Sequence, residues 1–185
     1  RYTESLVYTC FMLKMMNIDF ELKYINTQIV TRARNMCSSV FLEDSSFTHM
    51  LFIDADVVWN PIDVKKLISH NKECVVGLYP NKQYYWNRNV LTLNPSSVYE
   101  SPITTEGDLV KLKSAATGFM LLKRSALEKI KKDVEIFYLP GSNGKRVKLH
   151  NFFDCKVVDE DYLTEDYYFS YLFIKNGGEI FADTT

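Results

Sequence analysis

THMLFIDADVVWNPIDV (Thr48–Val64) contains the most hydrophobic strand-like run of the chain and the charges that end it. Its first part, Thr48–Ile53, predicts a buried strand. Asp54 and Asp56 follow at once, one residue apart, and Pro61 opens a predicted helix, where proline suits the first turn. Aspartate is common in turns. Since a buried strand end needs no carboxylates for its packing, the pair also indicates a ligand site.

Predicted strands and helices alternate along the rest of the chain. Helices are expected at 4–16, 31–42, from 61, after the strand within 115–132, and at 164–176; further strands are expected at 20–25, 74–79, 109–112 and 179–183, with a long loop at 80–102 that includes a short strand at 90–93. This alternation predicts an α/β fold with a mostly parallel central sheet flanked by helices and a small antiparallel element. Ligands bind such sheets beyond the carboxyl ends of the strands, which is where Asp54 and Asp56 fall.

The composition is that of a globular protein with one core. The chain has 185 residues, of which 46 % are hydrophobic and 24 % charged, and its net charge is −1. One domain of this length buries a sizeable core. The absence of a basic field argues against nucleic acid as a partner. No apolar run reaches the roughly 18 residues that a membrane span requires.

The cysteines indicate a reducing compartment. Cys10, Cys37, Cys74 and Cys155 are widely spaced and form no C-x-x-C pair. We therefore expect reduced thiols and no disulfide or zinc framework. The chain opens on Arg1 and not on methionine, so we also expect a fragment of a longer protein, with no signal-peptide pattern in it. A cytoplasmic location is predicted.

YLTEDYYFSYLF (Tyr162–Phe173) supplies a second pair of acids. Thr164 as N-cap, with Glu165 and Asp166 in the first turn, is favourable helix-start chemistry without any catalytic role. A carboxylate at a helix start that faces a cleft can also take a proton from a nucleophile. The residues alone leave both interpretations open.

Three more segments carry residues suited to phosphate. TRARN (Thr31–Asn35) places Thr31 as an N-cap and Arg34 near a helix start, and both helix N-termini and arginine forks bind phosphate or a planar base. YPNK places Lys82 in the long loop. Gly118 in ATGFMLLKR predicts a close backbone approach at a strand start. The alternatives are a solvated helix face, a surface lysine and an ordinary bulge.

Six blocks in this order resemble the nucleotide-sugar-dependent glycosyltransferases of the GT-A fold, and more narrowly the small enzymes of that type from bacteria and large DNA viruses. The blocks are TRARN, THMLFIDADVVWNPIDVKKLI, VVGLYPNK, AATGFMLLKRSALEKI, FFD and YLTEDYYFSYLFIKNGGEIFAD. The similarity covers nearly the whole chain, and six ordered blocks are far more specific than D-x-D alone. It implies a single GT-A (Rossmann-like) domain over residues 1–185 that transfers a hexosyl group.

The resemblance assigns the acids. Asp54 and Asp56 would form the D-x-D pair, with Asp56 a direct ligand of Mn²⁺ or Mg²⁺ on the donor diphosphate. Asp54 would bind the ribose or reach the metal through water. Asp166, with Glu165 beside it, matches the acidic pair that supplies the general base of inverting members.

The resemblance also assigns the donor contacts. Arg34 and Thr31 would contact the nucleotide, and Lys82 and Gly118 would lie near the diphosphate and the transferred sugar. The donor would be a nucleoside-diphosphate sugar, with UDP the commonest nucleotide of the group, and the acceptor a glycan or glycoprotein. We expect acceptor contacts at Tyr84–Trp86, since aromatic rings stack on sugar faces.

Two departures from the family pattern stand out. Relatives usually begin with a strand that carries the first nucleotide contacts, whereas this chain opens on the first predicted helix. Relatives also often supply a metal-binding histidine beyond the last strand, where this chain has ended at Thr185. The first bears on nucleotide affinity and the second leaves the metal one ligand short.

Rival functions use the same residues differently. LFIDADVVW also fits haloacid-dehalogenase-type phosphatases, with Asp54 as a nucleophile and Asp159–Asp161 as the later acidic motif. That family's D-x-D usually ends the first strand, whereas other elements precede it here. A catalytically inactive nucleotide-sugar-binding module is a further alternative. A sugar-nucleotide pyrophosphorylase would need a glycine-rich arginine loop that the chain lacks.

Overall fold

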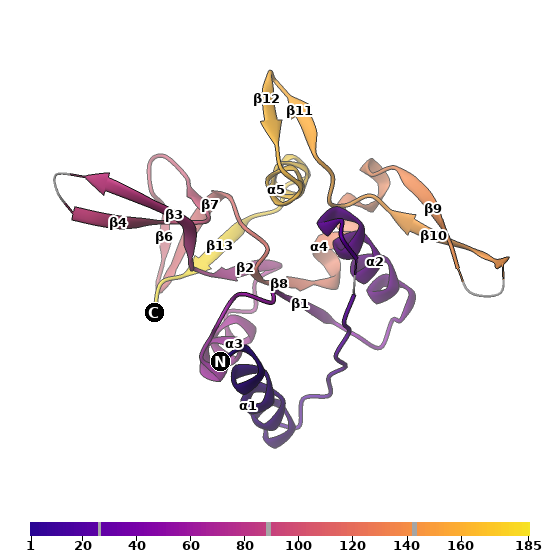
Figure 1. Ribbon diagram of the computed structural model, residues 1–185, viewed down its shortest axis with the longest axis horizontal. Coiled ribbons are helices and arrows are strands. Elements are labelled where there is room, and N and C mark those ends of the chain that lie inside the picture. The colour runs from indigo at the N-terminus through magenta and orange to yellow at the C-terminus, as the bar shows by residue number, and fades with distance from the viewer. Residues whose placement is uncertain (26, 88–89, 142–143) are drawn as a thin grey trace.

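The computed structural model describes residues 1–25, 27–87, 90–141 and 144–185, and over 81–95 it describes the backbone alone. Its centre is a seven-stranded sheet in the order β1-β8-β2-β13-β7-β5, with β6 paired to β7 (Figure 1). The strands of this sheet are β1 (His49–Ile53), β2 (Cys74–Gly77), β5 (Val98–Tyr99), β6 (Thr105–Glu106), β7 (Leu109–Ser114), β8 (Phe119–Lys123) and β13 (Ile180–Asp183).

Helices and three two-stranded hairpins surround this sheet. The helices are α1 (Tyr2–Met15), α2 (Val30–Glu43), α3 (Pro61–Ser69), α4 (Arg124–Ile130), the 3₁₀-helix η1 (Lys131–Asp133) and α5 (Glu165–Lys175). The hairpins pair β3 (Pro80–Asn87) with β4 (Val90–Pro95), β9 (Ile136–Pro140) with β10 (Arg146–His150), and β11 (Lys156–Val158) with β12 (Asp161–Leu163). No helix among the described residues is long and apolar enough to cross a membrane.

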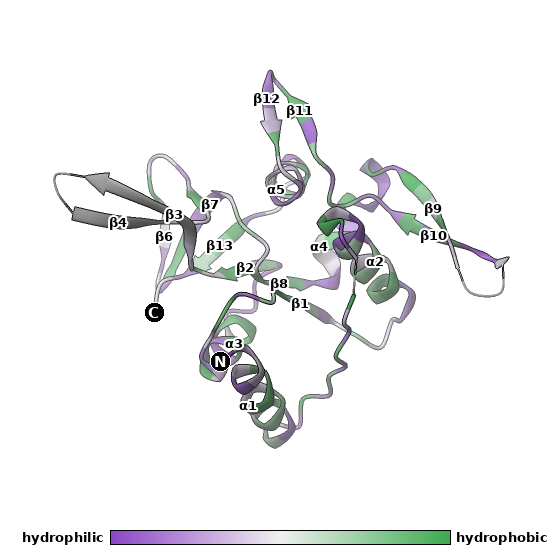
Figure 2. Ribbon diagram, viewed as in Figure 1, coloured by the Kyte–Doolittle hydropathy of each residue, from purple (hydrophilic) through white to green (hydrophobic). Residues whose placement is uncertain are grey.

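The sheet is the middle layer of three, with hydrophobic side chains on both of its faces. Along β8, Phe119 and Leu121 pack with residues of α1 and α3, whereas Met120 and Leu122 pack with α2, α4 and α5. This alternation is the two-residue period of a strand. Because both faces are buried, the central strands are almost wholly apolar, as Figure 2 shows by the green of β2, β8 and β13.

The expectation of a mostly parallel sheet is wrong. Among the described strands, β2 and β13 form a parallel pair, and the other pairs of the sheet are antiparallel. The strands β1 and β2, connected through α3, do run in the same direction, as the strand–helix–strand pattern predicts. However, β8 inserts between them in the opposite direction and pairs with both. The α/β class is confirmed, but its sheet is mixed and mostly antiparallel.

Local predictions otherwise agree with the structure at most positions. Asn60 caps α3 in a reciprocal capping box with Asp63, and Pro61 occupies the first turn. The Phe20–Ile25 segment, in contrast, is not a strand, because its backbone pairs with no described strand. The predicted long loop after Tyr79 contains the β3–β4 hairpin, of which the sequence predicted the short strand at 90–93 but not its partner β3. Within residues 136–163 the sequence predicted a loop at Pro140–Lys145, which lies between β9 and β10, but it did not predict the strands of the two hairpins.

Candidate functional site

The carboxyl ends of three strands meet at one edge of the sheet. Because β1, β2 and β13 run in the same direction, Asp54, Tyr79 and Asp183 follow or end them on that edge. Gly118 precedes β8, which starts there because it runs the opposite way. This edge is where an open α/β sheet binds ligands.

The Asp54–Val57 segment is a tight turn that carries two carboxylates. The Asp54 N–H donates to the Gly118 carbonyl at 2.9 Å, and the Asp54 carbonyl accepts from the Val57 N–H at 3.0 Å. The Asp54 side chain is 44 % exposed, and Asp56 is exposed as well. The rigid strand thus presents both acids to solvent from fixed backbone positions.

Arg34 joins this turn to two helices. Its side chain, on α2, is only 7 % exposed, and its Nη2 lies 3.3 Å from Asp54 Oδ2 and 3.4 Å from Oδ1. Its Nη1 donates to Oε1 of Glu165, at the start of α5. A buried guanidinium needs such partners, since breaking a buried ion pair leaves an uncompensated charge. Arg34 therefore positions the two acidic segments relative to each other.

The two acids of α5 have different environments. Glu165 is 13 % exposed and bound by Arg34. Asp166 accepts hydrogen bonds at Oδ1 from the Thr164 hydroxyl, at 2.6 Å, and from the Tyr167 N–H, at 2.9 Å. Within the described residues its Oδ2 has no hydrogen-bond partner. Asp166 is thus held in place through one oxygen, and the other can accept a proton.

Tyr79 is a member of this site that the sequence interpretation missed. Its hydroxyl accepts the Gly118 N–H at 2.9 Å. Burial raises the pKa of Tyr79 to about 12; the Gly118 hydrogen bond and Arg34 oppose the rise, and the Asp54 and Asp166 carboxylates add to it. The hydroxyl therefore keeps its proton at neutral pH and can donate it. A tyrosine directly after a buried strand was the available signal.

Gly118 shows the close approach that the sequence predicts, and the approaching group is Tyr79. A Cβ at this position would lie 2.3 Å from the Tyr79 hydroxyl oxygen and 3.2 Å from Asp54 Oδ2. Any larger residue would displace Tyr79. Next to it, the Thr117 hydroxyl is fully buried and has no hydrogen-bond partner among the described residues, which is unusual for a buried polar group.

The remaining residues predicted from the sequence lie on α2, on β3 and in the β11–β12 turn. Thr31 lies in the first turn of α2, one turn before Arg34, but the N-cap is Ile29, so the predicted capping role of Thr31 is wrong. Lys82 lies on β3 and Tyr84–Trp86 follow it there, with their side chains outside the described part of the chain. Asp159 and Glu160 form the β11–β12 turn with positive φ, which explains these acids of the rival motif structurally.

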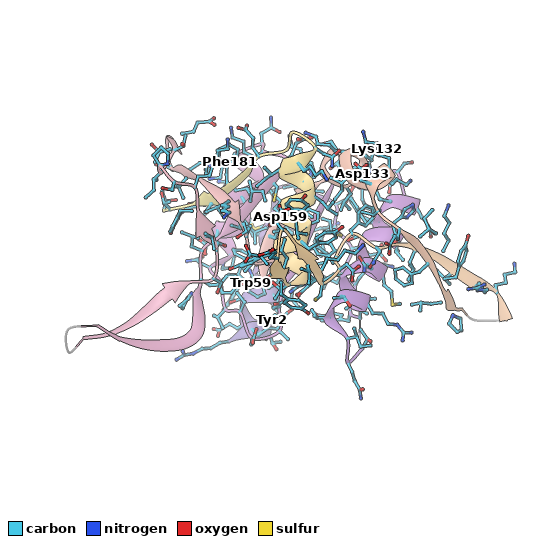
Figure 3. The ribbon with its side chains drawn as sticks, turned by 90° about the horizontal axis from the view of Figure 1, so that it is seen from above. Tyr2, Trp59, Lys132, Asp133, Asp159 and Phe181 are labelled. Carbon is cyan, nitrogen blue, oxygen red and sulfur yellow. The ribbon has the colours of Figure 1, made fainter. Side chains whose placement is uncertain are left out.

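A third carboxylate at this edge is already satisfied. Asp183 Oδ2 lies 2.7 Å from His70 Nε2, and its Oδ1 accepts from the Thr185 N–H and hydroxyl at 2.8 Å. Burial alone would raise the pKa of Asp183, but the hydrogen bonds from His70 and Thr185 outweigh it and lower that pKa. Trp59 and Phe181, labelled in Figure 3, belong to the hydrophobic cluster between the sheet and α1 and α3. Both oxygens of Asp183 are therefore already engaged by neighbouring side chains and backbone.

Asp54 and Asp56 are suited to a cation whose coordination shell is completed by water and by a bound substrate. Among the described residues, no group of three or more His, Cys, Asp or Glu side chains could hold a metal ion. Mg²⁺ commonly uses one or two carboxylates, with water and substrate phosphates completing the shell. Asp54 and Asp56, both open to solvent on one turn, match that donor set.

Comparisons with known proteins support the fold alone. No family model matches this chain, and no curated protein matches it. Solved structures do match, among them one titled "Crystal Structure of A197 from STIV", with a TM-score of 0.50 and 19 % sequence identity, which covers 93 % of this chain and 72 % of that chain. The similarity extends over most of both chains. At 19 % identity it concerns the fold and not the activity.

Proposed function

We propose that this chain is a metal-dependent glycosyltransferase that moves a sugar from a nucleoside-diphosphate donor, with UDP the expected nucleotide, to an acceptor hydroxyl. The observation that carries the proposal is the convergence of the Asp54–Asp56 turn, Tyr79, Gly118 and the Asp166 carboxylate on one sheet edge. An exposed acid pair that can hold a metal ion and a separate carboxylate that can take a proton are the two groups that the reaction requires.

Asp54 and Asp56 would hold Mn²⁺ or Mg²⁺. When bound, the ion neutralises the charge that grows on the diphosphate as the glycosidic bond breaks. Arg34 keeps Asp54 in place from the buried side. Tyr79, protonated at neutral pH, offers a hydroxyl hydrogen at the same point. Thr31 and Arg34 remain the proposed nucleotide contacts, and Lys82 and Gly118 the proposed contacts of the diphosphate and sugar.

Asp166 would act as the general base. Its carboxylate takes the proton of the acceptor hydroxyl as the hydroxyl oxygen attacks the anomeric carbon, so the anomeric configuration inverts in one displacement. Glu165 is occupied by Arg34, and we therefore assign it the role of positioning α5 instead of sharing the base function.

The test is a thermal-shift panel of nucleoside diphosphates with and without Mn²⁺, followed by a donor-hydrolysis assay. We expect UDP to raise the Tm only when Mn²⁺ is present, and Asp56→Ala to abolish that shift. UDP binding without donor hydrolysis would indicate an inactive binding module. Phosphate release from p-nitrophenyl phosphate with an aspartyl-phosphate trapped at Asp54 would indicate a phosphatase.

A further inference from the structure

The β9–β10 hairpin projects from the body of the molecule in both views of the ribbon (Figures 1 and 3). Its strands pair antiparallel, and residues directly opposite each other in such a pair share a face. The three pairs on the outer face are Ile136 with His150, Tyr138 with Lys148, and Pro140 with Arg146. Ile136 and Tyr138 on β9 therefore lie on the same face as Arg146 and Lys148 on β10, whereas the His150 ring stacks on the buried Phe152 at the base of the hairpin.

The inner face of the hairpin is attached to the protein, so its orientation is defined. Leu149 on the inner face is buried, and the backbone N–H of His150, at the end of β10, donates to the Ser39 hydroxyl of α2 at 2.9 Å. The outer face, in contrast, is open: Ile136 is 48 % exposed and Tyr138 47 %. The Arg146 guanidinium lies over the Tyr138 ring, 4.8 Å from its centroid, so a basic and an aromatic side chain of this face are in contact.

The basic side chains here lack acidic partners. The segment 131–150 contains five lysines and arginines against two acids, a net charge of +3 in a chain of −1. Among the described residues, Arg146 and Lys148 form no salt bridge, whereas Lys72, Lys111 and Lys129 each pair with a glutamate elsewhere. Burial, and then the nearby Lys131 and Lys148, lower the pKa of His150, which agrees with a positive local field.

Protection of a free strand edge explains only part of this pattern. Charged residues on edge strands prevent pairing with other chains, but such protection does not require an exposed isoleucine and tyrosine on the same face. Amphipathic surfaces with aromatic and aliphatic residues next to lysines and arginines are typical of the bilayer interface. An aliphatic side chain such as Ile136 gains little against a sugar or a nucleobase but is stabilised by acyl chains.

We propose that the outer face of the β9–β10 hairpin binds the surface of a bilayer that contains anionic phospholipid. Ile136 and Tyr138 enter the acyl boundary, and Arg146 and Lys148 contact the headgroup phosphates. This inference does not depend on glycosyl transfer, because it uses residues outside the candidate site.

The experiment is co-sedimentation of the chain with vesicles of phosphatidylcholine alone and of phosphatidylcholine mixed with phosphatidylglycerol. We expect binding to the anionic vesicles that weakens with added salt. Arg146→Gln with Lys148→Gln should weaken it about thirtyfold at low salt, from the usual contribution of each basic residue near an anionic surface. Tyr138→Ser should cause a loss that salt does not change.

The control is Lys65→Gln with Lys113→Gln, which removes the same charge from two exposed lysines outside the hairpin. This variant should bind anionic vesicles as the wild type does, and circular dichroism and thermal melting must show every variant folded. Equal binding to both vesicle types overturns the proposal, as does a loss in the control equal to that in the hairpin variant. Binding to a single-stranded oligonucleotide without vesicle binding also overturns it.

Discussion

The two ends of the central sheet each hold an arginine, and the partners of the two side chains differ. At the carboxyl end of β1, Arg34 lies between Asp54 and Glu165. At the opposite end, Arg124 follows β8, and its hydrogen-bond acceptors among the described residues are all backbone carbonyls, those of Phe41, Leu42, Asp44 and Phe47. Two of these carbonyls belong to the last turn of α2, which lacks helical partners for them.

The hydrogen-bond partners of the two arginines indicate that one has a structural role and the other belongs to the candidate site. Carbonyls at a helix end are a fixed requirement of the fold, and Arg124 satisfies them with its planar fork. The carboxylates of Asp54 and Glu165 belong instead to the segments that carry the candidate metal ligand and the candidate base, so Arg34 fixes site residues relative to each other. We therefore interpret Arg34 as part of the site and Arg124 as part of the scaffold.

The largest effect is expected from the arginines themselves. Arg34→Ala should lower the free energy of unfolding by about 3–5 kcal/mol, because Glu165 and Asp54 lose their shared partner. Arg124→Ala should cost about 2 kcal/mol through its lost charged hydrogen bonds. Urea denaturation measures both. The Mn²⁺-dependent UDP shift should disappear in Arg34→Ala and persist in Arg124→Ala; its loss in a folded Arg124→Ala would contradict the distinction.

Asp166→Asn should separate turnover from donor binding at the site beyond the carboxyl end of β1. We expect turnover to fall at least ~100-fold, the usual contribution of a general base, while donor binding remains. Single-turnover kinetics together with the UDP thermal shift would measure the two separately. Asp161→Asn, a change of the same kind at an exposed position on β12, is the matched control and should leave turnover unchanged. Unaltered turnover in Asp166→Asn would remove Asp166 from the mechanism.

Tyr79→Phe should have a smaller effect. It deprives the Gly118 N–H of its acceptor, which costs about 1 kcal/mol of stability, and removes a hydroxyl donor beside Asp54. Tyr171→Phe is a suitable control, because within the described residues the Tyr171 hydroxyl forms no hydrogen bond. Thermal melting compares the two. A Tyr79→Phe protein as stable as the control would show that the hydroxyl does not position Gly118.

The smallest expected effect is on the pH dependence of stability, which differs between the two ends of the central sheet. Burial, and then Lys123, lower the pKa of His49 at the start of β1. The unfolded chain then binds the proton more readily, so stability falls as the pH drops below about 6.5. The Asp183 pKa is also lowered, so its contribution is present above the unfolded value of 3.8 and is lost only as the pH falls below it.

His49→Gln should therefore reduce the loss of stability between about pH 7.5 and about pH 5.5, and His70→Gln should reduce the loss at more acidic pH. Urea denaturation from about pH 7.5 down to about pH 3 measures both effects. His150 contributes in the same direction as His49, so part of the dependence should remain in the single variant. A profile unchanged by His49→Gln would show that its burial does not affect proton binding.

The sequence predicted the elements that depend on local chemistry. The helix after Pro61, the strand before Asp54 and the end of α5 at Gly177, where φ is +76°, follow from caps, turns and hydrophobic periodicity. The predicted Phe20–Ile25 strand failed because alternation alone does not supply a partner strand. Tyr79 was missed because its role depends on Gly118, thirty-nine residues away.

By itself, the sequence determined the layered α/β class and the position of two carboxylates at the end of a hydrophobic strand, since both follow from patterns within about ten residues. That strand, β1, was expected to be buried, but it lies at an edge of the sheet and its residues are only half-buried. Only the tertiary structure decided that β8 lies between β1 and β2 and that Arg34 joins Asp54 to Glu165, 131 residues from Arg34 in the chain. Strand order and ion pairing depend on which surfaces are buried together. That choice is made by the packing of the whole chain and leaves no local pattern.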